Sequence, residues 1–380
     1  MPLLEEKEGN IPVFHPFVGS KAKEYVSETL DSKWIGQGPK VDKFEKEFSN
    51  KFCPSSVCLS VGAGTDALHL AYLLAGLKEG DEVIAPLFTC TATNIPFLYM
   101  GVKIKFADVQ LDTLNLDPNH VRELMSDRVK AIVCVHYGGL PCDMDELQEI
   151  ADEWGVPIIE DAAHALGASY KRKNIGAISD YTMWSFQAIK HITTGDGGML
   201  ALGHTPRQDA QVEKAKRIRW FGIDRAAKQG GIWENDITEI GYKYQMTDLS
   251  AALGLASLEE FDSVLAHRRK IFSLYKQELS NLPDVTFVGG NKEDRVHSAW
   301  LCTIFIENRH SLQIKLAEHG IESNQCHFRN DRYAIFKEFW ENKEFPHMDM
   351  IQDDYLVLPL HHRVSEGDVL RICGLIKEGW

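Results

Sequence analysis

Lys190 is the residue whose setting in this sequence most strongly indicates covalent chemistry. It lies in MWSFQAIKHITTGDGGML, a stretch of apolar and small residues, whereas most lysines are solvated surface charges. Burial in such a stretch lowers the pKa of the amine and supplies the neutral form that can make a Schiff base with a carbonyl group. Ser185 offers a hydroxyl to a phosphate group, while Asp196 is more typical of a turn than of a catalytic position.

Two further segments place polar groups directly after apolar runs. In PIIEDAAHALGA, Asp161 is either a helix cap or a buried ligand for a cation, such as the pyridine nitrogen of pyridoxal 5′-phosphate (PLP). His164 could reach the ring oxygen of that cofactor or simply pack. In VGAGTDALHLA, Ala63 and Gly64 can form a tight turn and Thr65 can open a helix, whose N-terminus attracts anions. Taken alone, a plain strand-to-helix turn explains this short glycine motif better.

A mostly parallel sheet is the element that would bring these residues together. Between residues 57 and 202, short β-branched runs alternate with helical patterns, which predicts βαβ units. Ligands of such sheets bind beyond the carboxyl ends of the strands, and the candidate residues follow predicted strands. We expect helices at 66–77, 119–126 and 144–154, and strands at 57–61, 82–85, 102–107, 131–136, 157–160, 181–186 and 198–201.

The pattern changes in the second half of the chain. Residues 246–275 predict one long helix with an apolar stripe. Extended segments at 285–288 and 299–306, a helix at 310–319 and a final helix from Ser365 predict a smaller α+β unit. We therefore expect a large α/β domain over residues 1–255, including an N-terminal arm, and a small α+β domain over residues 256–380.

Composition excludes several classes of protein. The 380 residues are 44% hydrophobic and 25% charged, which is ordinary for a globular chain, and the net charge of −14 argues against nucleic-acid binding. The eight cysteines form no C-x-x-C pair or zinc-site spacing, which suits a reducing compartment. The acidic start lacks the features of a signal peptide, and no apolar run is long enough to span a bilayer. We expect a cytoplasmic protein without metal, nucleic-acid or membrane partners.

Seven ordered motifs resemble those of the DegT/StrS family of sugar aminotransferases, which are fold type I PLP enzymes. They cover residues 30–260 densely. The motifs are WIGQGPKVDKFEKEF (34–48), GTDALHLA (64–71), DEVIAP with FTCTAT (81–93), VHYGGLPCDMDEL (135–147), IIEDAAHALGA (158–168), SFQAIKHITTGDGGML (185–200) and IGYKYQMTDLSAALGL (240–255).

The resemblance implies roles for individual residues. Lys190 carries PLP as a Schiff base and moves protons between the cofactor and the substrate carbon, and Asp161 pairs with the pyridine nitrogen. His164 sits beside the ring oxygen. The other cofactor-binding positions that it implies are Ala63, Gly64, Thr65, Cys90, Ser185 and Lys243. Family members are usually homodimers with shared active sites, and the GYKYQM segment would cross to the partner.

The sequence departs from the family pattern at several positions. Lys243 replaces an asparagine that is frequent in the family, and could give the phosphate a charged contact. Gln245 stands where arginine is frequent, and Gln187 where histidine is frequent. Cys90 replaces an aromatic residue that stacks on the cofactor, so that another residue could supply the stacking.

The substrate side of the site rests on weaker signals. Sugar nucleotides carry a diphosphate, which needs cationic donors in an acidic protein. A surface ion pair or a packing role explains each candidate at least as well. The predicted substrate-binding residues are Trp34, Arg219, His327 and Arg329, with Arg225 and Arg332 as further cations.

The favoured function is the transfer of an amino group from L-glutamate to a nucleotide-linked keto-deoxysugar. The C-4 position is favoured because WIGQGP resembles C-4 members, and C-3 amination stays open. A PLP-dependent sugar dehydratase is an alternative, although some such relatives carry histidine where this chain has Lys190. A PLP-binding regulatory protein would predict the loss of Lys190 or Asp161, and a dinucleotide-dependent oxidoreductase would need a G-x-G-x-x-G motif after the first clear strand.

Overall fold

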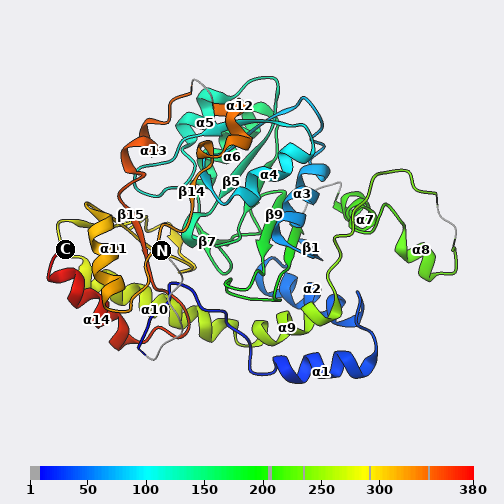
Figure 1. The fold of residues 1–380 in the computed structure, drawn as a ribbon. Helices are drawn as coiled ribbons and strands as arrows, with labels where there is room; N and C mark the ends of the chain where they lie inside the picture. The colour runs from blue at the N-terminus through cyan, green and yellow to red at the C-terminus, as the bar shows by residue number, and fades with distance from the viewer. Residues whose placement is uncertain (1–8, 204–207, 234–235, 291, 341–342) are drawn as a thin grey trace.

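The computed structural model describes residues 9–203, 208–233, 236–290, 292–340 and 343–380. Within these residues, seven strands form the central sheet in the order β1-β10-β9-β6-β5-β2-β4. Figure 1 labels β1, β5 and β9 of this sheet. Only β10 runs opposite to the others, so the predicted mostly parallel α/β sheet is confirmed. The strands are β1 (Val57–Val61), β2 (Glu82–Pro86), β4 (Lys103–Ala107), β5 (Val129–Val135), β6 (Ile158–Asp161), β9 (Tyr181–Ser185) and β10 (Gly198–Leu202).

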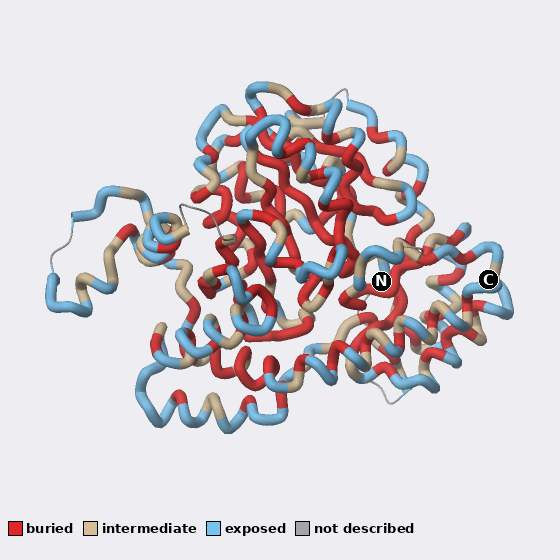
Figure 2. The backbone as a smooth tube through the Cα atoms, turned by 180° about the vertical axis from the view of Figure 1, so that it is seen from behind, coloured by how far each residue is buried: buried red, intermediate tan, exposed pale blue. Residues whose placement is uncertain are grey.

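Both faces of this sheet are covered. Alternate residues of β5 belong to two separate apolar cores, with Ala131 and Val133 on one side and Ile132 and Cys134 on the other. This arrangement explains why the strands are apolar at nearly every position. Figure 2 shows the buried backbone concentrated in this central region. The helices that follow the strands are α3 (Gly64–Leu74), α4 (Thr91–Tyr99), α5 (Pro118–Leu124) and α6 (Met144–Trp154).

A smaller unit with its own core follows. Among the described residues, its sheet has three strands: β11 (Val285–Phe287), β13 (Cys302–Ile306) and β15 (Tyr355–Leu358). Ser365 and Asp368 form a capping box at the start of the last helix. Ile11 of the N-terminal arm packs in the same core. The helices of this unit are α10 (Phe261–Leu279), α11 (Arg309–Glu318) and α14 (Glu366–Lys377).

One segment returns from the smaller unit to the large sheet. Strand β14 (Phe328–Arg329) pairs with β3 (Phe88–Thr89), which places the residues before β14 next to the carboxyl end of β2. Helices α12 (Lys337–Trp340) and α13 (Pro346–Ile351) follow it. A domain boundary at residue 255 stays a prediction.

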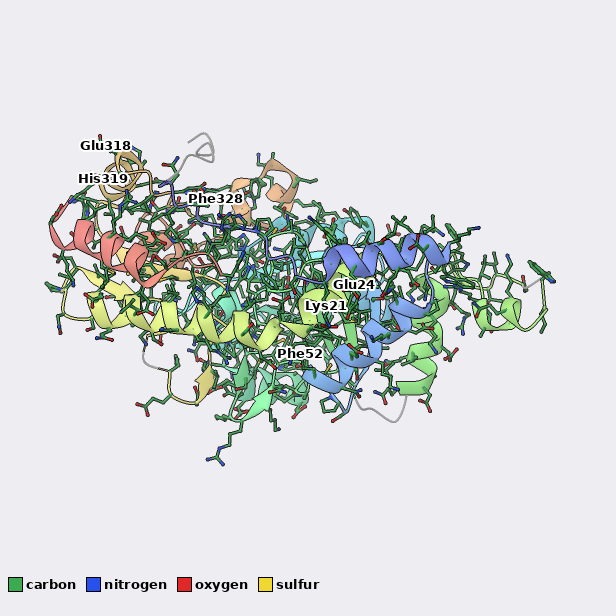
Figure 3. All side chains as sticks on the ribbon, turned by 90° about the horizontal axis from the view of Figure 1, so that it is seen from below. Lys21, Glu24, Phe52, Glu318, His319 and Phe328 are labelled. Atoms are coloured by element: carbon green, nitrogen blue, oxygen red, sulfur yellow. The ribbon has the colours of Figure 1, made fainter. Side chains whose placement is uncertain are left out.

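The predicted long helix at 246–275 is wrong in one respect. It consists of α9 (Asp248–Glu259) and α10, which meet at Glu260, where φ is −101° and ψ is 1°. The apolar periodicity continues through the break, and no glycine or proline marks it. The first helix, α1 (Ala22–Ser32), lies along α9, and Lys21 before it pairs with Glu259 at 2.9 Å (Figure 3).

A projection leaves one side of the large unit. It contains α8 (Arg225–Gln229), reached from α7 (Gln208–Ile218), and Figure 1 shows it extending away from the sheet. Helix α2 (Pro39–Phe52) lies before β1. Short strands β7 (Ser169–Tyr170), β8 (Lys173–Asn174) and β12 (Arg295–Val296) form a separate small sheet. In the described part of the chain, no helix combines the length and the apolar character that crossing a bilayer requires.

Candidate active site

A cavity of about 500 Å³ lies at the carboxyl ends of the parallel strands. Most of the predicted cofactor-binding residues line it, although they come from segments far apart in the sequence. Phe14 of the N-terminal arm and Trp300 of the smaller unit also line it. The predicted residues that it brings together are Ala63, Gly64, Thr65, Cys90, Asp161, His164, Ser185, Lys190 and His327.

Lys190 reaches into this cavity from the loop between β9 and β10. Burial lowers the pKa of its amine to about 8, against an ordinary value of 10.5. At neutral pH roughly a tenth of such an amine is neutral, compared with well under a hundredth for an unperturbed lysine. The Nζ atom lies 3.7 Å from the centroid of the Trp300 ring. Lys190 therefore combines access to the cavity with the protonation behaviour that attack on a carbonyl requires.

Asp161 ends β6 and is buried. Its Oδ2 accepts a hydrogen bond from the hydroxyl of Thr93 at 2.8 Å, and its Oδ1 accepts one from the backbone N–H of Ala163 at 3.1 Å. Burial nevertheless raises the pKa of this carboxyl group. Among the described residues, no cationic side chain bonds Asp161. A buried carboxylate of this kind that faces a cavity fits a cationic ligand atom, and the protonated pyridine nitrogen of PLP is such an atom.

The start of α3 faces the same space. Its first backbone N–H groups, those of Gly64 and Thr65, have no partner within the helix and can bind an anion. A Cβ atom on Gly64 would lie 3.0 Å from the Cβ of Ser185 and 3.0 Å from Met183 Cε. A side chain at position 64 would therefore crowd the end of β9, where the Ser185 hydroxyl lies beside the helix start. This cradle fits the phosphate of PLP.

Three aromatic rings form one wall. The ring of His164 stacks on Trp300 with centroids 3.7 Å apart and planes at 15°, and His327 lies parallel to His164 at 5.0 Å. The N–H of Gly138 donates to Nδ1 of His164 at 3.3 Å, so the neutral ring carries its proton on Nε2. Burial lowers the pKa of His164 well below its ordinary range and that of His327 to about 3. Both rings are neutral near pH 7.

Lys243 lies outside this cavity. Its Nζ is 3.4 Å from the ring centroid of Trp220, and desolvation of the amine lowers its pKa. Trp34 and Arg219 line a second cavity of about 600 Å³ between α2 and the α7–α8 region. Trp34 is 52% exposed. Within one chain, none of the three reaches the cavity that contains Lys190.

Arg219 and Arg329 are held by internal partners. Arg219 is buried and donates to Glu45 Oε1 at 2.6 Å and to the carbonyl of Ser60 at 2.8 Å. Arg329 pairs with Asp331 at 2.6 Å and also with Asp349. These partners neutralise both guanidinium groups. Substrate contacts for Trp34, Arg219 and Arg329, and a cofactor contact for Lys243, stay predictions.

Sequence reasoning missed Thr93 and Trp300. Thr93 lies in the FTCTAT motif but carries no chemistry that would single it out before its contact with Asp161 is known. Trp300 lies more than one hundred residues after Lys190, and its ring reaches the cavity only because the smaller unit packs against the sheet. No local signal in the sequence could have indicated that contact.

One buried cluster offers groups that metals bind. Cys134, His136 and Cys142 have ligand atoms within 4.8 Å of one another. Nε2 of His136, however, lies 2.8 Å from Glu160, and its Nδ1 accepts from the N–H of Cys142 at 3.0 Å. Both ring nitrogens are thus already used in hydrogen bonds, and a metal would have to displace one of them.

A parallel sheet with a lysine, a buried carboxylate and an anion cradle at its carboxyl edge defines a fold type I enzyme that uses PLP. A model of the DegT/DnrJ/EryC1/StrS aminotransferase family matches residues 17–377. The chain belongs to this family, whose members are PLP-dependent aminotransferases.

Individual relatives are similar over almost their whole length. The chain is 34% identical to the GDP-perosamine synthase of Escherichia coli O157:H7, over 97% of this chain and 98% of that protein. The crystal structure of AtS13 from Actinomadura melliaura is 33% identical, with a TM-score of 0.92 over 99% of this chain and 100% of that chain. Spr1654 from Streptococcus pneumoniae, in its PLP form, is 27% identical with a TM-score of 0.91, over 97% and 98%.

Proposed function

We propose that this aminotransferase moves an amino group from L-glutamate to C-4 of a nucleotide-linked keto-deoxysugar. The observation that carries the proposal is the convergence of a lysine of lowered pKa and a buried carboxylate on one cavity. Similarity to a GDP-perosamine synthase over the whole chain supports a nucleotide-sugar substrate. When bound, PLP supplies the carbonyl through which the amino group is exchanged and an electron sink for the carbon that loses a proton.

The residues of the chain divide the work around that cofactor. Lys190, with a pKa of about 8, can carry a proton to and from the reacting carbon near neutral pH. Asp161 stabilises positive charge on the pyridine nitrogen, and the start of α3 with Ser185 binds the phosphate. His164 carries its proton on Nε2, because its Nδ1 accepts from the backbone N–H of Gly138, and this Nε2 lies 3.3 Å from Nε2 of His327.

We propose a homodimer in which each site is completed by the partner. The projection that carries α8 is largely exposed (Figure 2) and presents large apolar side chains that a monomer leaves in water, including Trp233 at 79% exposure and Ile240 at 81%. Lys243 and Trp34 lie near its base. In a dimer, Lys243 and Trp34 would face the cavity of the second copy. We also propose a cytoplasmic location, which the eight free cysteines of this chain support.

The test is the absorbance spectrum of the purified chain with PLP, before and after L-glutamate. We expect a cofactor band that changes with glutamate and returns when a 4-keto-6-deoxysugar nucleotide is added, with an amine at C-4 in the product by NMR. Lys190→Ala is the control and should not retain the cofactor covalently after borohydride reduction. A product aminated at C-3 would overturn the proposed amination at C-4. Loss of a hydroxyl without amination would favour the dehydratase, and a spectrum identical to that of Lys190→Ala would refute the proposal.

A further inference from the structure

The segment between β12 and β13, residues 297–301, connects the smaller unit to the loops that surround the active-site cavity. The hydroxyl of Ser298 donates to the carbonyl of His164 at 2.5 Å, and the backbone N–H of Trp300 donates to the carbonyl of Gly138 at 3.1 Å. Ala299 between them has φ of +55°, a left-handed conformation that is unfavourable for alanine. Such a conformation persists only where neighbouring contacts hold it, and here it directs Trp300 toward the cavity.

Arg268 of α10 provides two of those contacts. Its Nε donates to the carbonyl of Ala299 and its Nη2 to the carbonyl of Trp300, both at 2.9 Å. The residue is 3% exposed, and within the described part of the chain no carboxylate forms an ion pair with it. Burial lowers the pKa of the guanidinium group to about 9, which leaves it charged at neutral pH.

A buried charge without a carboxylate partner is costly, but an apolar side chain of similar size would remove the donors to the buried carbonyls of Ala299 and Trp300. The guanidinium of Arg268 therefore does more than fill space, because it holds the backbone of this segment. Its two hydrogen bonds end on the residue with the left-handed backbone and on the tryptophan beside Lys190. The two hydrogen bonds of Arg268 thus join the contacts that Gly138 and Ile189 make with that tryptophan.

Residues 298–300 contact the loop between β9 and β10, which carries Lys190, at three points. Nζ of Lys190 lies 3.7 Å from the centroid of the Trp300 ring, and the indole N–H of Trp300 donates to the carbonyl of Ile189 at 3.4 Å. Nε2 of His191, the next residue along, lies 2.9 Å from the carbonyl of Ser298 and donates to it. The residues on both sides of Lys190 are thus tied to the segment that Arg268 fixes.

The charge of Arg268 also acts on the lysine. Burial is the main cause of the lowered pKa of Lys190, and the positive charge of Arg268 lowers it further. Cys326, Asp161 and Cys90, which face the amine from other elements, raise it. Burial and then Arg268 likewise lower the pKa of His191.

We propose that Arg268 is a positioning residue for Lys190. By binding the carbonyls of Ala299 and Trp300, it holds the indole of Trp300 against the lysine amine. It thereby couples the smaller unit to the loop between β9 and β10 that carries Lys190. This inference rests on the proposed function, because it takes Lys190 as the residue that carries the cofactor.

Arg269 provides a matched control. It is adjacent on α10 and also clamps backbone carbonyls, with Nε bound to the carbonyl of His297 at 3.0 Å and Nη2 to that of Gly167 at 2.8 Å. It makes no hydrogen bond to Ala299 or Trp300. A general structural role for these arginines predicts equal effects at both positions, whereas a positioning role predicts an effect at Arg268 alone.

The experiment compares Arg268→Met, Arg268→Lys and Arg269→Met in the full-length chain. Without cofactor, acetylation of Lys190 by acetic anhydride is followed by peptide mass spectrometry over a pH series. Because Arg268→Met removes a positive charge, its midpoint should move to higher pH, while those of Arg268→Lys and Arg269→Met stay in place. With PLP and L-glutamate, both Arg268 variants should react roughly tenfold more slowly, since misplacement of a catalytic group by about 1 Å can cost up to a hundredfold.

The acetylation midpoints and the reaction rates of these variants test the positioning role of Arg268. If Arg268→Met matches Arg269→Met in both midpoint and rate, the proposal is overturned. If Arg268→Met does not fold by circular dichroism, Arg268→Lys decides: a parental rate overturns the proposal, and a slow reaction with an unchanged midpoint supports it. Failure of the proposed function is seen separately, because the parent chain would then show no covalent cofactor at Lys190. That result would remove this inference with it, whatever the acetylation midpoints.

Discussion

Replacing Thr93 with valine should weaken cofactor binding without disturbing the fold. The hydroxyl of Thr93 donates to Oδ2 of Asp161 at 2.8 Å, both residues are buried, and valine has nearly the same shape. A hydrogen bond to a charged group contributes about 1.5–3 kcal/mol, and about 1.4 kcal/mol is tenfold in an equilibrium constant. Without that bond the pKa of Asp161 rises further, so its carboxylate stabilises a cationic pyridine nitrogen less well. We expect the PLP concentration for half-saturation to rise roughly 10- to 100-fold.

The assay is an equilibrium titration of the cofactor-free chain with PLP, followed by absorbance. Thr93→Ser is the matched control, because it keeps the hydroxyl and loses only a methyl group, and it should bind PLP nearly as well as the parent. Urea unfolding of the cofactor-free variants reports any change in stability separately. If Thr93→Val binds PLP as tightly as Thr93→Ser, the hydrogen bond does not tune Asp161 and the reasoning is refuted.

Three other predictions follow from the same site. Acetylation of Lys190 in the cofactor-free chain should be half-maximal near pH 8, because burial lowers its pKa to about 8, and a midpoint near its ordinary 10.5 would contradict the burial argument. Burial raises the pKa of Asp161 above its ordinary 3.8, so the folded cofactor-free chain binds this proton more tightly than the unfolded chain, and stability is lost as pH rises from about 3.8 through the folded pKa. Asp161→Asn should flatten that loss in a pH series of thermal melts and abolish amino transfer; a melting profile that keeps the parental slope would count against it. Gly64→Ala puts a Cβ 3.0 Å from that of Ser185 and should cost about 1–3 kcal/mol by overpacking. The control Gly374→Ala, where the added atom meets nothing within 4 Å, should gain about 0.5–1 kcal/mol in urea unfolding, and equal effects at the two glycines would argue against a crowded cradle.

The strands of the large sheet are predictable because their signal is local. Each is a short apolar or β-branched run between turn residues, and β1 lies at Val57–Val61 as predicted. The boundary between α9 and α10 is not predictable in this way. The apolar stripe continues across Glu260, because α10 starts in the core of the large unit at Phe261 and enters the core of the smaller unit at Ile271.

The residues of the candidate site also differ in how far the sequence alone can predict them. Lys190 and Asp161 stand out in the sequence because a charged residue at the end of an apolar run needs a reason to be there. Arg219 and Arg329 carry charges that look equally available in the sequence. Their carboxylate partners show that availability is a property of the folded chain, since Glu45 lies 174 residues from Arg219.

By itself, then, the sequence determined the parallel sheet, the order of its strands along the chain, and the residue types that can do chemistry at their ends. Only the tertiary structure decided which of these meet: Thr93 with Asp161, Trp300 with Lys190, and Arg268 with the carbonyls that hold Trp300. The physical reason is that periodicity and turn chemistry act over a few neighbouring residues, whereas burial, pairing and pKa depend on whatever lies within a few ångströms in space.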